Sequence, residues 1–252
     1  IPKAAFDYVD GAARDEVTYD ESRETFRSIR LLPNVLTGAT ELDLSVDIAG
    51  GRSALPFGIA PTGFTRFMHA EGEDAGASAA TAAGIPFTLS TMGTRSVEEV
   101  ERASGRGRRW FQLYLWKDRA ASAELLRRAA ASGYDTLVVT VDTPVAGQRL
   151  RDTRNGMRIP PRLTAGTVLD AAWRPEWWFN FLTTDPVTFA SLTSTTGTLG
   201  ELVNTMFDPG LNFDDLEWIR EQWDGKMLVK GIVNPADART VIELGADGVV
   251  VS

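Results

Sequence analysis

Two stretches of the sequence share one pattern and decide the expected fold: GYDTLVVT at residues 133–140 and GADGVVVS at residues 245–252. Each begins with a glycine at the end of a helical pattern, continues as an apolar run and closes on a hydroxyl residue. A third stretch, GIPFTLS at residues 84–90, follows the same plan. A glycine just past a helix followed by a short apolar run is typical of a helix leading into a buried strand. The repetition predicts one structural unit that is used several times.

The same alternation extends over most of the chain. Apolar runs that predict buried strands lie at residues 57–60, 87–89, 110–114, 137–141, 227–229 and 249–251. Helical patterns lie between most of them, at residues 71–83, 97–103, 120–131 and 235–244, and a further helix is expected at 212–222. Strands that alternate with helices, without hairpin signals, indicate right-handed βα units and a parallel sheet.

The ends of the expected strands distinguish between two α/β folds. A doubly wound dinucleotide fold would carry a G-x-G-x-x-G turn after its first strand, whereas here that strand leads into Pro61, Thr62 and Gly63. Residues suited to chemistry instead stand at the end of nearly every strand: Thr62, Ser90, Gln112, Tyr114, Thr140, Asp142, Lys230 and Ser252. Barrels build their sites in this way, around the carboxyl ends of many strands. We therefore predict an α/β fold, a (β/α)8 TIM barrel with an N-terminal helical segment.

The number of strands predicts an incomplete barrel. Six strands are expected, whereas a closed barrel of this class has eight. The chain also opens inside a helical pattern and ends on an apolar strand. We expect a single domain over residues 1–252 that is truncated at both ends, with a partial barrel over 54–252. A long excursion after the fourth strand, residues 144–226, is expected to form a lid or a binding surface.

Aromatic residues are concentrated in one part of this excursion, residues 173–181. The segment contains three tryptophans and two phenylalanines: Trp173, Trp177, Trp178, Phe179 and Phe181. Two interpretations stay open. The aromatic side chains could pack against the barrel or a neighbouring subunit, or they could contact a membrane surface, where tryptophan and phenylalanine are favoured.

Composition excludes several classes of function. The net charge of −8 argues against a nucleic-acid partner, and the absence of cysteine excludes disulfides, thiolate nucleophiles and cysteine-ligated metals. No metal site is expected. His69, the single histidine, lies between a loop and a helix, where a capping or packing role is favoured over catalysis. The arginine-rich stretch 105–109 precedes a strand rather than a helix, which favours a solvated loop over a phosphate site.

Several polar residues are expected to converge at the barrel mouth. Residues two apart on a strand share a face, so Gln112 points with Tyr114, and Thr140 with Asp142. Lys230 closes the next strand. A carboxylate, a phenol and a fixed cation suit proton abstraction with charge stabilisation. The alternative is structural, with Asp142 as a helix cap and Lys230 as an ion-pair partner.

A series of motifs in order resembles one known family. They are FDYVDG (6–11), IAPTG (59–63), HAEGE (69–73), TLSTM (88–92), FQLY (111–114), VTVDTP (139–144) and LVKG (228–231). Together they resemble the FMN-dependent 2-hydroxy acid dehydrogenase and oxidase family. Within it, LRDTRNGM (150–157) and WWF (177–179) are most similar to the bacterial flavin-dependent L-lactate dehydrogenases. The resemblance covers essentially the whole chain.

The resemblance implies a set of residues that hold the cofactor, FMN. The backbone of Pro61, Thr62 and Gly63 would run along the flavin. Side chains from three strand ends would hydrogen-bond to the edge of the flavin ring: Ser90, Gln112 and Thr140. Lys230 would lie where negative charge accumulates when the flavin is reduced.

The resemblance also implies roles in binding and oxidising the substrate. Tyr8 would hold the substrate carboxylate, with Arg149 as a mobile second contact, and Tyr114 would hydrogen-bond near the reacting hydroxyl. Asp142 would stabilise the protonated form of a catalytic histidine. In the family, that histidine and a carboxylate-binding arginine follow the strand that here ends at Ser252, as do the units that hold the FMN phosphate. We therefore expect the 252-residue chain to be inactive and prone to aggregate alone, and its parent protein to be active.

The expected reaction is oxidation of an L-2-hydroxy acid, with L-lactate to pyruvate favoured, and with electrons passing to a quinone, a cytochrome or oxygen. The resemblance suggests a homotetramer. We expect a cytoplasmic protein, with peripheral attachment to the inner face of the cell membrane through residues 173–181 as an open alternative. Two alternative functions stay open: a Schiff-base aldolase that uses Lys230 as its nucleophile, and a non-enzymatic interaction module.

Overall fold

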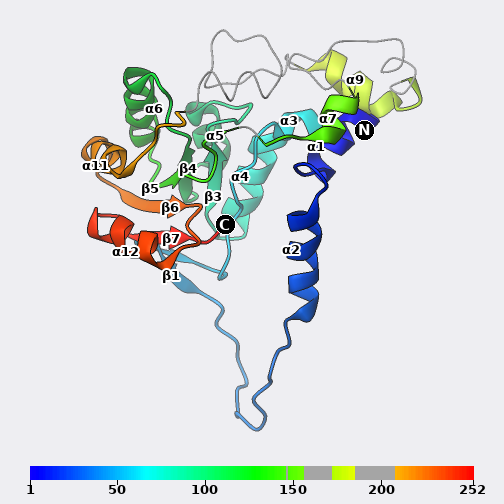
Figure 1. The fold of residues 1–252 in the computed structure, drawn as a ribbon. Helices are drawn as coiled ribbons and strands as arrows, with labels where there is room; N and C mark the ends of the chain where they lie inside the picture. The colour runs from blue at the N-terminus through cyan, green and yellow to red at the C-terminus, as the bar shows by residue number, and fades with distance from the viewer. Residues whose placement is uncertain (146, 156–171, 185–207) are drawn as a thin grey trace.

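The centre of the molecule is a parallel sheet whose strands follow one another in chain order. The computed structural model describes residues 1–145, 147–155, 172–184 and 208–252 (Figure 1). The strands pair in the order β3-β4-β5-β6-β7. Their bounds are Phe87–Ser90, Arg109–Leu113, Thr136–Thr140, Lys226–Lys230 and Gly248–Val250. Each strand therefore pairs with the next, as expected for consecutive strands in the wall of a barrel.

Helices connect these strands and cover one side of the sheet (Figure 1). They are α4 Gly72–Ala82, α5 Val97–Ser104, α6 Arg119–Ala131, α11 Phe213–Gln222 and α12 Pro235–Glu243. Side chains cap their first turns. Ser96 and Glu99 form a capping box at α5, and Asp118 accepts a hydrogen bond from the Ala121 N–H at α6. Such caps satisfy N–H groups that have no partner within the helix.

The predicted α/β fold is confirmed as part of a (β/α)8 barrel, with five of the six expected strands in place. In the described ranges these strands form an open run that does not close. The expected strand at 57–60 was wrong as a strand, because only Ile59 pairs, through a single parallel bridge to Phe87. Pro56 and Pro61 flank this segment and have no N–H to donate to a ladder.

The N-terminal region contains the expected helical segment and adds short elements that the sequence pattern did not reveal. Helices α1 (Lys3–Asp10) and α2 (Val17–Ser28) precede a short antiparallel hairpin, β1 (Val46–Ile48) with β2 (Gly51–Ser53), and α3 (Thr65–Met68) follows. Helix α2 buries none of its residues and lies away from the sheet (Figure 1). The hairpin escaped prediction because its strands have three residues each, too few to show an alternating pattern.

The arginine-rich stretch before β4 is not the solvated loop that was predicted. The Arg108 guanidinium donates to the carbonyls of Ile48, Ala49 and Gly51, and it pairs with Asp135. Arg109 is buried, and its guanidinium donates to backbone carbonyls in the loops on either side. The two guanidinium groups are therefore structural, because they donate hydrogen bonds to backbone carbonyls that would otherwise lack donors. Arg108 attaches the hairpin to the amino-terminal edge of the sheet.

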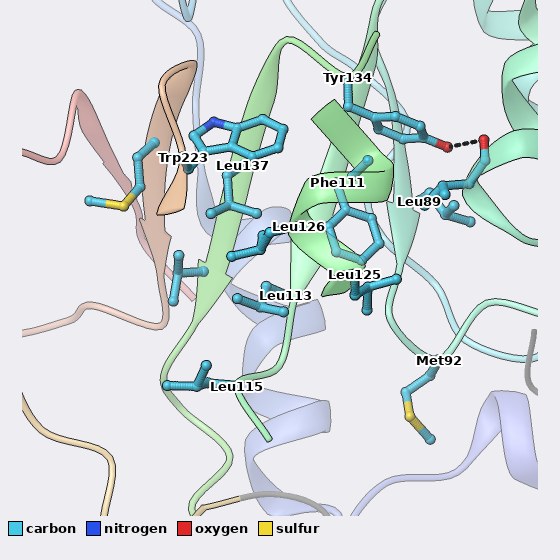
Figure 2. Packing of buried hydrophobic residues seen from close by; sticks show 14 of the residues in the cluster. Leu89, Met92, Phe111, Leu113, Leu115, Leu125, Leu126, Tyr134, Leu137 and Trp223 are labelled. Carbon is cyan, nitrogen blue, oxygen red and sulfur yellow. Dashed lines mark hydrogen bonds between the residues drawn. The ribbon is translucent and has the colours of Figure 1, made fainter. Parts of the chain in front are cut away.

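The hydrophobic core lies between the sheet and its helices. Figure 2 shows side chains from β4, β5, α6 and the segment after α11 packed together, and the labelled members include Phe111, Leu126, Leu137 and Trp223. Each of these four side chains is at most 2% exposed. Burying a large apolar side chain contributes roughly 1.5–3 kcal/mol, so this cluster fixes the sheet and with it the positions of the strand ends.

The first described parts of the long excursion, α7 (Leu150–Asn155) and α9 (Pro175–Thr183), lie beside the N-terminal helices, and its last part, α11, leads back into the sheet. Helix α7 packs against α1, and α9 places Trp177 edge-on against Phe67, with ring centroids 6.4 Å apart. The remaining residues of the predicted excursion, 146, 156–171 and 185–207, lie outside the described ranges, as does the end of the LRDTRNGM motif.

Candidate active site

A buried row of polar side chains crosses the carboxyl ends of three neighbouring strands. The Ser90 hydroxyl donates to Gln112 Oε1 at 2.9 Å, and Gln112 Nε2 donates to Thr140 Oγ1 at 2.9 Å. All three residues are at most 5% exposed. Buried polar groups of this kind are retained when hydrogen bonds satisfy them. The structure thus brings together the three side chains that were predicted to bond the flavin edge.

A lysine and an aspartate meet at the ends of β5 and β6. Lys230 Nζ lies 3.5 Å from Asp142 Oδ2 and 3.0 Å from Ser252 Oγ, which itself donates to Asp142 Oδ2 at 3.3 Å. Gly231, with φ of +106°, makes room for the carboxylate, because a Cβ there would come within 2.6 Å of Asp142 Cβ. The chain therefore requires a glycine at this turn.

Tyr114 extends beyond β4 toward this pair and is half-buried. Burial raises the pKa of its phenol, and the negative charge of Asp142 raises it further. Tyr114 therefore stays protonated at neutral pH and can donate a hydrogen bond.

Tyr8 reaches the site from α1. Its ring packs edge-on against Phe64, with centroids 5.6 Å apart, and the Arg149 guanidinium lies over the ring at 5.1 Å. Burial raises the pKa of Tyr8 to about 12; Arg149 opposes the rise, while Asp152 and Tyr114 add to it. The two phenols are thus within electrostatic reach of each other. Tyr8 also stays a hydrogen-bond donor at neutral pH.

Charged residues attach α7 and the residue before it to α1, and among them sequence reasoning missed Arg151 with its partners Asp10 and Glu16. Arg149 Nε lies 2.6 Å from Asp152 Oδ2, and Arg149 also donates to the Tyr8 carbonyl. Arg151 pairs with Asp10 at 2.9 Å and with Glu16. Four of these contacts join residues 135 to 148 positions apart in the chain, so no local sequence pattern could have shown them. They are Arg149 with Tyr8, Arg151 with Asp10, Arg151 with Glu16, and Asn155 with Asp7.

The loop of Pro61, Thr62 and Gly63 lies against the turn that follows β3. The Phe64 N–H donates to the Met92 carbonyl at 3.2 Å, and a Cβ at Gly63 would lie 3.0 Å from Met92 Cβ. A side chain at position 63 would push the two loops apart. Because residue 63 is a glycine, this backbone stays close to the ends of β3 and β4.

His69 is placed away from these groups. Its side chain is 68% exposed, and its Nδ1 accepts a hydrogen bond from the Glu71 N–H at 3.3 Å. This contact agrees with the capping role that the sequence favoured. Within the described ranges, no group of three or more histidine or acidic side chains is arranged to hold a metal ion.

The donor set fits a flavin. A planar ring with several hydrogen-bonding atoms on its edge matches the row of Ser90, Gln112 and Thr140, and Lys230 supplies a cation on the adjacent strand. Two protonated phenols face the same region from α1 and from the end of β4. Fold and site together define the class of flavin-dependent (β/α)8-barrel enzymes.

Comparison with known proteins places the chain within this class. The profile of the FMN-dependent dehydrogenase family matches residues 1–252. The chain therefore belongs to the FMN-dependent dehydrogenase family, whose cofactor is FMN.

Two relatives and two solved structures illustrate the match. A Mycobacterium tuberculosis protein, provisionally named an L-lactate dehydrogenase, is 57% identical over all of this chain and 61% of its own length. The L-lactate dehydrogenase of Ectopseudomonas mendocina is 41% identical, with 68% of its length covered. The crystal structure of the monotopic membrane protein (S)-mandelate dehydrogenase superposes on the whole chain with a TM-score of 0.92, 36% identity and 68% coverage of that protein. A mandelate oxidase structure superposes with a TM-score of 0.81, at 33% sequence identity and with 64% of that chain covered. The chain thus spans about three fifths of the mycobacterial relative.

Proposed function

We propose that the protein oxidises an L-2-hydroxy acid to the 2-oxo acid, with L-lactate to pyruvate as the favoured reaction. The observation that carries this proposal is the convergence of two protonated phenols, Tyr8 and Tyr114, on an edge that also holds the Lys230–Asp142 pair and the buried amide row. The names of its relatives, lactate and mandelate enzymes, support the substrate class.

The residues of this chain divide the work as follows in the proposal. Tyr8 donates to the substrate carboxylate and Arg149 adds a positive charge, while Tyr114 donates to the 2-hydroxyl oxygen and orients it. FMN, when bound, would accept the hydrogen of C2 together with the two electrons of the C2–H bond. Ser90, Gln112 and Thr140 would hold its ring edge, the backbone of Pro61, Thr62 and Gly63 would lie along it, and Lys230 would offset the negative charge that reduction creates.

The proton of the hydroxyl needs a base. The family resemblance assigns this role to a histidine beyond residue 252, and Asp142 would stabilise its protonated form. Because the only histidine of these 252 residues is exposed and caps a turn, we propose that the 252-residue chain alone does not turn over 2-hydroxy acids. We further propose that residues 1–252 form part of one domain, in which residues 54–252 belong to the barrel.

An absorbance spectrum tests the main proposal. The protein at its full natural length is mixed anaerobically with L-lactate, D-lactate or (S)-mandelate. Bleaching of the flavin bands by an L-2-hydroxy acid and not by D-lactate supports it, and the faster of the L-substrates sets the preference. A flavin that none of the three acids bleaches would contradict it. Trapping of a covalent adduct at Lys230 by borohydride would instead favour the aldolase alternative, and absence of both flavin and adduct the interaction module.

A second proposal concerns where the electrons go. Helix α9 exposes Phe179 and Leu182, and Trp173, two residues before the helix, is exposed as well. One similar structure is described as a monotopic membrane protein. None of the helices in the described ranges is long and apolar enough to cross a membrane. We therefore propose that α9 rests on the inner face of the cell membrane, where a quinone would be the acceptor in place of a cytochrome or oxygen.

Vesicle binding tests the membrane proposal. The double variant F179E/L182E should no longer sediment with anionic vesicles, and its rate with a soluble dye acceptor should stay unchanged. The matched control, V17E/F26E, places the same two charges on exposed apolar residues of α2 and should still sediment. Equal binding by both variants would exclude α9 as the contact.

A homotetramer is our proposal for the assembly. The segment between α2 and β1 exposes apolar side chains to an unusual degree, among them Leu31, Leu32 and Leu36 at 91% or more. Contiguous exposed apolar residues commonly mark protein contacts. Light scattering on the full-length protein measures the number of subunits.

A further inference from the structure

The chain leaves the sheet abruptly after β3, while the neighbouring strand continues. The Gly93 N–H donates to the Ser90 carbonyl at 2.8 Å, and the Met92 N–H donates to the Ser90 hydroxyl at 3.1 Å. These bonds close a tight turn directly after Ser90. On β4, in contrast, the polypeptide extends past Gln112 to Tyr114, the residue proposed to orient the reacting hydroxyl.

Where the chain after β3 turns away from β4, the Thr91 side chain replaces its backbone carbonyl as a hydrogen-bond acceptor. Ser90 is in register with Gln112, and the Thr91 N–H donates to the Gln112 carbonyl at 3.0 Å. A regular parallel ladder would continue with a bond from the Tyr114 N–H to the Thr91 carbonyl. The Tyr114 N–H instead donates to the Thr91 hydroxyl at 3.0 Å.

The same hydroxyl has a second bond that fixes its direction. Thr91 Oγ1 donates to the Gln112 carbonyl at 2.6 Å, so its lone pairs are left to accept from Tyr114. Thr91 is fully buried, at 0% exposure. A buried hydroxyl with both a donor and an acceptor role on one strand holds two backbone groups, at residues 112 and 114, in one geometry.

We propose that Thr91 is a positioning residue for Tyr114. Its hydroxyl continues the β3–β4 ladder by one step after the backbone has turned away, and thereby sets the height of the Tyr114 phenol above the sheet. The proposal deepens the proposed function and rests on it, because Tyr114 matters only if a 2-hydroxy acid is the substrate. Thr91 contacts neither substrate nor cofactor in this role and acts through Tyr114.

The decisive variants are T91V and T91S in the full-length protein. Valine has the shape of threonine without its hydroxyl, so it removes the acceptor of the Tyr114 N–H and one of the two donors to the Gln112 carbonyl. The loss of such a hydrogen bond predicts a fall of about tenfold in kcat for L-lactate, with KM changed by less than about twofold. T91S keeps the hydroxyl and should restore kcat to within about twofold of the wild type.

A matched control separates positioning from general loss of stability. Thr136 is equally buried at the amino-terminal end of β5, and its hydroxyl donates to Asp135 Oδ1 at 2.7 Å. T136V makes the same chemical change at the other edge of the sheet. It should lower the melting temperature, as T91V does, and leave kcat unchanged.

Amide hydrogen exchange on the full-length protein without substrate gives a readout that needs no turnover. The Tyr114 amide should exchange faster in T91V than in the wild type or in T91S. Faster exchange together with lower kcat in T91V alone supports the proposal. Unchanged exchange in T91V, equal kcat losses in T91V and T136V, or no recovery in T91S would each overturn it. A wild-type flavin that no 2-hydroxy acid bleaches would refute the proposed function instead, and exchange would then decide alone whether Thr91 holds Tyr114.

Discussion

Strand β6 carries a lysine at each end, and the two lysines have different surroundings. At the amino-terminal end, Lys226 Nζ lies 2.6 Å from Asp247 Oδ1, and the other oxygen of that carboxylate accepts from the Met227 N–H at 2.9 Å. At the carboxyl end, Lys230 Nζ lies 3.5 Å from Asp142 Oδ2. One cation is held by a short pair that the fold itself completes. The other makes a longer contact beside two half-buried phenols.

The rest of each edge repeats this contrast. The amino-terminal edge holds the β1–β2 hairpin through Arg108, whose guanidinium is engaged with three carbonyls and with Asp135. The carboxyl edge collects an amide, hydroxyls and phenols from β3, β4, β5 and α1. In barrels the amino-terminal edge serves stability and the carboxyl edge serves function. Lysines at the two edges therefore serve different purposes. The distance from each lysine to its carboxylate distinguishes the structural pair from the pair at the site.

The largest expected effect comes from neutralising the two lysines in turn. K230M removes the fixed cation from the carboxyl edge and should slow flavin reduction by L-lactate by about 10²–10³-fold, the range typical of one lost stabilising group. K226M removes the cation at the other end of the same strand and should leave that rate within about twofold while lowering the melting temperature. Anaerobic stopped-flow absorbance measures both rates. Comparable losses of rate in the two variants would refute the division between the edges.

The second effect concerns substrate binding at the carboxyl edge. Y8F removes a donor to the proposed carboxylate, and a hydrogen bond to a charged group predicts that KM for L-lactate rises by roughly tenfold or more. Because the pKa of Tyr8 is raised to about 12, KM in the wild type should not respond to this phenol as the pH rises past 10.

Tyr134 provides the control for Y8F. It is buried, and its hydroxyl donates to the Val97 carbonyl at 3.2 Å, between α5 and the start of β5. Y134F makes the same change outside the carboxyl edge and should leave KM as it is. Steady-state kinetics over a range of pH measures both variants. A rise in KM for Y134F, or none for Y8F, would argue against Tyr8 as the carboxylate ligand.

The carboxyl edge was more predictable from the sequence than the amino-terminal edge. Ser90, Gln112, Thr140 and Lys230 each follow an apolar run, and parallel strands bring their carboxyl ends to one edge, so periodicity alone predicted that they meet. Arg108 gave no such signal. Its partners lie 57 to 60 residues earlier in a hairpin too short to recognise, so it was taken for part of a solvated loop.

Other features of the site also depended on contacts distant in the sequence. The attachment of α7 to α1 through Arg151 joins residues more than 130 positions apart. Thr91 was part of a quoted motif, but its role depends on a turn that its own backbone makes and on the register of β4. Pattern and spacing predict which face a residue occupies, and they do not predict which backbone group lacks a partner there.

A third prediction concerns the glycine that accommodates Asp142. G231A places a methyl group 2.6 Å from Asp142 Cβ, at a φ of +106° that disfavours alanine, and the carboxylate must move. We expect kcat to fall by about tenfold, since small displacements at a catalytic group are costly. Gly105 has φ of +54° with no atom within 4 Å of its absent Cβ, so G105A tests backbone strain alone and should leave kcat unchanged. Equal kcat in G231A and the wild type would show that Asp142 has room to shift.

The smallest expected effect is on the free energy of unfolding, to which Asp247 at the amino-terminal edge contributes in a pH-dependent way. The pKa of Asp247 is lowered overall: burial raises it, but the Lys226 pair and the Met227 N–H lower it more. A depressed pKa stabilises the fold above the pKa of an unfolded aspartate, and this contribution is lost as the pH falls below about 4. D247N should therefore cost about 1 kcal/mol at pH 7, allowing for solvent screening, and less at pH 3. D224N changes an exposed neighbour and should cost little at either pH.

Chemical denaturation at pH 7 and pH 3 measures these differences. The raised pKa of Tyr8 has the opposite sign: its contribution to stability is complete below pH 10 and is lost as the pH rises toward 12. Acid should thus remove the contribution of Asp247 at the amino-terminal edge, and alkali that of Tyr8 at the carboxyl edge. If D247N were equally destabilised at pH 3 and pH 7, the ion pair with Lys226 would not be what holds the amino-terminal edge together. The contacts of Arg108 with three carbonyls of the hairpin would then carry that role.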